Sequence, residues 1–87
     1  MEEVAVDLVE NLNKVNGFSH LMITRCALTN FTLIHPLESK SAREVSRLFM
    51  NAVLVPFDIK RVHQDNGRCF RAHDWLELMS LFDVKII

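Results

Sequence analysis

About midway along this chain the apolar residues change from strand spacing to helical spacing, and that change most constrains the fold. Before it, three short runs rich in β-branched and aromatic residues predict strands at 4–9, 21–24 and 31–34, the last of them ending at Pro36. Asn16-Gly17, between the first two runs, is a strong signal for a β-hairpin. The first part of the chain is therefore predicted to be a three-stranded antiparallel meander.

After the change, apolar residues repeat at helical spacing from Val45 to Val53, which predicts an amphipathic helix. Ser41 and Glu44 form a capping-box pattern at its start, in which the serine caps the first turn and the glutamate reaches back. Pro56 ends the predicted helix.

The rest of the chain predicts four elements: a strand at 59–63, a turn at 65–67, a helix at 75–82 and a strand at 84–87. Asp74 and Glu77 repeat the capping-box pattern before the second helix. The order β-β-β-α-β-α-β predicts an α/β fold with a mixed sheet. Because a strand–helix–strand crossover returns the later strand in parallel, the strand at 59–63 can lie beside the first strand.

The length and composition indicate one domain, 1–87, with a modest core. A hydrophobic fraction of 49% with 24% charged residues is typical of a globular chain. No segment is long and apolar enough to span a bilayer, so no membrane partner is expected. The net charge of −1 argues against a strong, independent nucleic-acid binder, which usually carries a basic excess.

The cysteines and the acidic start favour an intracellular protein, either nuclear or cytoplasmic. Cys26 and Cys69 lie far apart without a CxxC pair, a pattern typical of reduced thiols. The four histidines have no zinc-ligand spacing to a cysteine pair, so a zinc site is not expected. Met1-Glu2-Glu3 is not the basic start of a signal peptide.

Two aspartates point to chemistry. Asp7 lies inside an apolar stretch and Asp65 at the end of another, and both stretches are predicted to be buried strands. Burying an unpaired carboxylate costs on the order of several kcal/mol. Two acids on adjacent strands would share a divalent metal, as in phosphoryl-transfer sites, although no third ligand is evident. The alternatives are a polar strand end for Asp7 and an ordinary turn residue before Asn66-Gly67 for Asp65.

Short motifs follow one another along nearly the whole chain: Val6-Asp7-Leu8, Gly17-Phe18-Ser19-His20, Pro36-Leu37, Lys40-Ser41-Ala42, Asp65-Asn66-Gly67 with Phe70, Leu76 to Leu81, and Val84-Lys85-Ile86. Together they resemble the catalytic core of retroviral and long-terminal-repeat retrotransposon integrases, closest to the gypsy-like and spumavirus-like branch. The ordered set is more specific than the turn at 65–67 alone, because such a turn is common.

This resemblance implies an RNase H-like fold and a three-carboxylate site, in which Asp7 and Asp65 are catalytic acids and metal ligands. The third acid, a glutamate, would fall beyond Ile87, and Glu77 does not match it. The resemblance also implies weakly bound Mg²⁺ or Mn²⁺ and, as partner, DNA that is joined by phosphodiester transfer. We therefore expect a truncated core, without the zinc-binding and DNA-binding domains of such integrases.

Departures from the family pattern suggest relaxed constraint. Gln64 stands where a serine or threonine commonly precedes the second aspartate. Asp83 replaces a helix-ending glycine, although aspartate tolerates the left-handed conformation less well. The chain is thus expected to be an element-derived remnant of an integrase, inactive alone. The alternative is a non-catalytic module that forms a homodimer or binds a related integrase.

A basic cluster flanks Asp65. Lys60, Arg61, Arg68 and Arg71 are candidates for contact with DNA phosphates. Such a cluster is more often a solvated face, and the net charge of the chain favours that interpretation.

Overall fold

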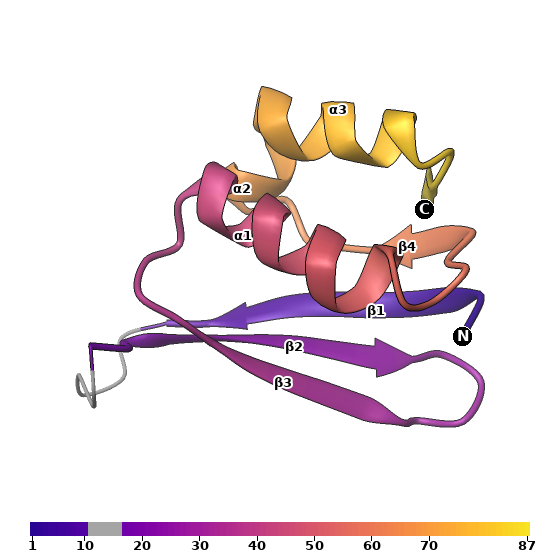
Figure 1. Ribbon diagram of the computed structural model, residues 1–87, viewed down its shortest axis with the longest axis horizontal. Helices are drawn as coiled ribbons and strands as arrows, with labels where there is room; N and C mark the ends of the chain where they lie inside the picture. The colour runs from indigo at the N-terminus through magenta and orange to yellow at the C-terminus, as the bar shows by residue number, and fades with distance from the viewer. Residues whose placement is uncertain (11–16) are drawn as a thin grey trace.

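The computed structural model describes residues 1–10 and 17–87. It shows a mixed five-stranded sheet with helices on one face (Figure 1). The strands are β1 (Glu3–Val9), β2 (His20–Cys26), β3 (Thr32–Leu37), β4 (Arg61–His63) and β5 (Lys85–Ile86). The helices are α1 (Ala42–Phe49), its π-helical continuation η1 (Met50–Leu54), α2 (Arg68–Arg71) and α3 (His73–Leu81). The predicted α/β class with a mixed sheet is confirmed.

The strands lie in the order β3-β2-β1-β4-β5. The pairs β1–β2 and β2–β3 are antiparallel, as the predicted meander requires. The pairs β1–β4 and β4–β5 are parallel, so the strand before Asp65 does return beside the first strand. Of the predicted hairpin, Asn16 lies outside the described residues, and Gly17 has the positive φ of 88° that glycine allows.

Three elements differ from those that the sequence predicted. The third strand was predicted to end at Pro36, and β3 instead passes through Pro36 to Leu37, which is possible because β3 is an edge strand. The strand predicted at 59–63 pairs over only its last three residues, 61–63. Helix α2 was not predicted, because four residues are too few to show a helical period.

Of the two predicted capping boxes, the first has the predicted serine cap. Ser41 is the N-cap of α1, and its Oγ accepts a hydrogen bond from the Glu44 backbone N at 3.2 Å. The Glu44 carboxylate reaches past the cap to the backbone N of Glu38 at 2.9 Å and the Oγ of Ser39 at 2.7 Å. Glu44 therefore fastens the β3–α1 loop to the helix.

The second capping box is wrong. Helix α3 begins at His73 after Ala72, whose extended backbone ends α2, so Asp74 already lies in the first turn. Within the part of the chain that the structure describes, no side chain caps the start of this helix. Glu77 Oε2 instead lies 2.9 Å from His73 Nε2, one turn along the exposed face of the helix.

The hydrogen bonds to Glu44 predict a pH-dependent loss of stability in Glu44→Gln. Burial raises the pKa of Glu44, but the hydrogen bonds from Ser39 and from the Glu38 backbone outweigh it and hold the pKa below its ordinary 4.5. The stabilisation is thus complete above pH 4.5 and is lost as the pH falls through the lowered pKa. In urea unfolding we expect a loss of about 1–2 kcal/mol at neutral pH that shrinks near pH 3.

Glu77→Gln is the matched control for that measurement, because the Glu77 side chain is 58% exposed and its pair with His73 lies in solvent. It should change the unfolding free energy little at either pH. An equal effect of the two substitutions would contradict the assigned role of Glu44.

The core lies between the sheet and the helices. Trp75, Phe49 and Phe70 form its centre, with the Trp75 ring centroid 4.9 Å from each of the other two. The sheet contributes Val4, Val6, Met22 and Val62, all fully or almost fully buried. All the helices that the structure describes lie on this one side of the sheet (Figure 1), so none of them covers the opposite face, which we call the open face. None of the helices in the described ranges is long and apolar enough to cross a membrane.

Candidate functional site

Asp7 and Asp65 meet on the open face of the sheet. The β1–β4 register pairs Ala5 with His63, and continuing it two residues sets Asp7 opposite Asp65. Both aspartates line one cavity of about 500 Å³, together with side chains of β2 and β4. The sequence placed these two acids side by side through the parallel crossover, and the structure brings them together. Their role as metal ligands stays a prediction.

The expectation that the two aspartates are buried is wrong, because both are exposed. Side chains alternate along a strand, so Val4 and Val6 point into the core while Asp7 points to the open face. The run 4–9 looked continuously buried because its outward positions also include apolar residues, Ala5 and Val9. The cost of burying a carboxylate therefore gives no reason for either acid to need a cation.

Local hydrogen bonds orient each carboxylate. Asp7 Oδ1 accepts from the Leu8 backbone N at 2.9 Å. Asp65 Oδ1 accepts from the Gly67 backbone N at 2.6 Å, which closes the turn before α2 and agrees with the alternative of a turn aspartate. Over the described residues, neither Oδ2 atom has a hydrogen-bond or ion-pair partner, so each acid has one oxygen available to a ligand.

Three basic residues on and beside β4 are paired with acids: Lys60, Arg61 and His63. Glu3 Oε1 accepts a hydrogen bond from Arg61 Nε at 2.6 Å. The other carboxylate oxygen, Glu3 Oε2, lies 2.6 Å from His63 Nε2. The hydrogen bond from Arg61, followed by that from His63, lowers the pKa of Glu3. Lys60 lies 3.2 Å from Asp58. Of the four basic residues considered for DNA contact, Arg61 and Lys60 are thus engaged in ion pairs within the chain.

The donor set fits one weakly held divalent cation. Among residues 1–10 and 17–87, no group of three or more His, Cys, Asp or Glu side chains is arranged to hold a metal. Two carboxylates on one cavity match the oxygen ligands that Mg²⁺ and Mn²⁺ prefer, with water completing the coordination. A site for two metals would need further acids.

Gln64 is a residue of the site whose contacts the sequence did not reveal. Its Oε1 accepts from Trp75 Nε1 at 2.7 Å, and its Nε2 donates to the Phe70 backbone O at 3.1 Å. The sequence marked Gln64 only as a departure from the family pattern. Strand alternation was the available signal, because it directs the residue before Asp65 towards the helices.

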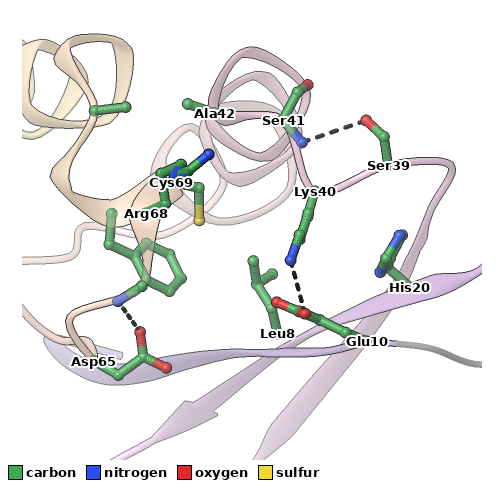
Figure 2. Close-up of a pocket in the computed structure, with 13 residues that line it drawn as sticks. Leu8, Glu10, His20, Ser39, Lys40, Ser41, Ala42, Asp65, Arg68 and Cys69 are labelled. Carbon is green, nitrogen blue, oxygen red and sulfur yellow. Dashed lines mark hydrogen bonds and ion pairs between the residues drawn. The ribbon is translucent and has the colours of Figure 1, made fainter.

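A larger cavity of about 770 Å³ lies where β1 ends, near the starts of α1 and α2 (Figure 2). Glu10 and Lys40 join its two walls through an ion pair of 2.9 Å, and Asp65 lies at its edge. Burial, followed by the charge of Asp65, raises the pKa of the Cys69 thiol in its wall. Glu10 and Lys40 are both well exposed, so their pair contributes little to stability. The lining of this cavity contains both acidic and basic side chains, so the cavity does not carry charge of a single sign.

No protein-family model and no curated protein matches this chain.

Proposed function

We propose that this chain forms an integrase-type, RNase H-like domain with a remnant metal site at Asp7 and Asp65. The observation that carries the proposal is the meeting of two exposed carboxylates, distant in sequence, on one cavity of the sheet. The sheet supports it too, because three antiparallel strands are followed by two parallel returns on the far side of β1.

In this proposal Asp7 and Asp65, which line the same cavity, would hold one Mg²⁺ or Mn²⁺ through their carboxylate oxygens. The ion would polarise a phosphodiester oxygen of bound DNA. Arg25 lies in the wall of the same cavity and would meet a phosphate group there. With two acids in place of three and a net charge of −1, we expect weak DNA binding and no strand transfer by these 87 residues alone.

A cation titration tests the proposal. Mg²⁺ and then Mn²⁺ are added to the folded chain, and the NMR signals of Asp7 and Asp65 are followed. We expect saturable changes at both residues, with a dissociation constant on the order of 1 mM, as in weak oxygen-ligand sites. Asp65→Asn keeps the side-chain shape but removes the charge, and should weaken binding at least about tenfold.

Asp58→Asn is the control, because Asp58 is an exposed aspartate paired with Lys60 outside this cavity. It should bind the cation like the unmodified chain. A folded protein whose signals do not saturate with either cation would rule out the metal site.

A second candidate is a non-catalytic module that dimerises or binds a related integrase. The open sheet face favours it, since Ile34 is 59% exposed and stands beside Ile23 in the strand register. Uncovered apolar surface of this kind promotes association. In size-exclusion chromatography we expect the apparent mass to rise with protein concentration, and Ile34→Lys to suppress the rise; a monomer at every concentration would count against this candidate.

A further inference from the structure

Gln64 links the candidate site to the core. It stands between His63, the last residue of β4, and Asp65. Along this segment Val62 is fully buried beneath the helices, whereas Asp65 is exposed on the cavity of the open face. The Gln64 side chain follows Val62 in direction, because its amide meets residues of α2 and α3. The Gln64 amide thus faces the helices, while Asp65, the next residue, faces the cavity.

Both ends of the Gln64 amide are engaged. The oxygen accepts from Trp75 Nε1 at 2.7 Å, and the nitrogen donates to the Phe70 backbone O at 3.1 Å. Trp75 is fully buried, and its ring packs between those of Phe49 and Phe70. Gln64 is therefore fastened to the tightly packed centre of the domain, where side chains have little freedom to move.

The turn after Gln64 leaves little freedom to Asp65. Its carboxylate accepts from the Gly67 backbone N at 2.6 Å, and Gly67 is the N-cap residue of α2. A Cβ at Gly67 would lie 2.8 Å from Asp65 Oδ1, so this carboxylate lies directly against the backbone of the turn. The residue before Asp65 is therefore anchored to the core through the Gln64 amide, and the Asp65 carboxylate is anchored to the turn through Gly67.

We infer that Gln64 is a positioning residue, whose amide fixes where the Asp65 carboxylate lies relative to Asp7. This inference rests on the proposed metal site for its functional meaning. Groups that orient metal ligands without touching the metal commonly change metal affinity about 10- to 100-fold. The geometry of Asp65 itself is testable without any metal.

The test variant is Gln64→Met, which keeps the length of the side chain and removes both hydrogen bonds. The first measurement is the Gly67 amide proton in NMR, which reports the bond to Asp65 without any metal. We expect its signal to move upfield as the short, charge-assisted bond lengthens. The second is the Mg²⁺ titration, in which we expect about tenfold weaker binding.

Two further variants separate positioning from a general loss of stability. Val53→Ala removes a fully buried side chain on η1, at the end of α1 away from α2 (Figure 1), and should leave both measurements unchanged. Gln64→Glu keeps the acceptor for Trp75 Nε1 and should keep the Gly67 amide signal near its original position. If Gln64→Met does not fold, Gln64→Leu, which is apolar and smaller, gives the same comparison.

The outcomes distinguish this inference from the proposed function. A folded Gln64 variant without the hydrogen bonds, yet with the original Gly67 signal and cation affinity, would overturn the positioning role. An unmodified chain that binds neither cation would remove the metal site, while the Gly67 signal would still decide whether Gln64 positions Asp65.

Discussion

Replacing Trp75 with alanine is expected to remove most of the stability of this domain. The Trp75 side chain is fully buried, packs against Phe49 and Phe70, and donates a hydrogen bond to Gln64. Truncating such an aromatic residue typically costs about 3–5 kcal/mol. A domain of this length has a total unfolding free energy of about 4–13 kcal/mol, so a large part of the population should unfold.

The measurement is urea unfolding followed by circular dichroism, because Trp75 is the one tryptophan of the chain and the variant has no indole fluorescence. Leu76→Ala is the matched control. Leu76 is the next residue of the same helix and is 43% exposed, so its loss should change stability by about 0.5 kcal/mol or less. Similar midpoints for the two variants would show that Trp75 does not anchor the core.

Thr24→Val is expected to stabilise the domain. Thr24 lies on the core face of β2 and is fully buried, and its Oγ1 has no hydrogen-bond partner among residues 1–10 and 17–87. A buried hydroxyl without a partner costs about 1–3 kcal/mol in protein mutational data, and valine has nearly the same shape without that group. The unfolding free energy should therefore rise by about that amount, measured from the urea midpoint at constant m-value.

Thr32→Val provides the comparison on the neighbouring strand β3. Thr32 is exposed, and its hydroxyl donates to the Asn30 backbone O at 2.9 Å. The same substitution there should lower stability slightly, because it removes a hydrogen bond and exposes a methyl group. A loss of stability in Thr24→Val would mean that the Thr24 hydroxyl bonds to a buried water.

Local patterns along the chain predicted most of the elements correctly. Runs of β-branched residues marked β1, β2 and β3, and helical spacing after Ser41 marked α1. The departure at Asp83 was also informative, because this residue ends α3 with a positive φ of 55°, the conformation that favours glycine. Such features depend on near neighbours in sequence, so they are legible without a tertiary structure.

The candidate site was predicted in part. The order of strands and helices predicted that β4 would return in parallel beside β1, and this pairing brings Asp65, two residues after β4, close to Asp7 on β1. Their burial was predicted wrongly, because an apolar run does not reveal which face of a sheet the helices will cover. The role of Glu77 was also misjudged, since the start of α3 depends on where α2 ends at Ala72.

The sequence by itself determined the class of the fold and the pairing of two acids, since both depend on local periodicity and on the order of strands and helices. Only the tertiary structure decided that both carboxylates face solvent and that Arg61 is held by Glu3. It also decided that Gln64 ties the site to Trp75. The physical reason is that exposure and side-chain hydrogen bonding depend on neighbours far away in sequence, which the packing of helices against one face of the sheet selects.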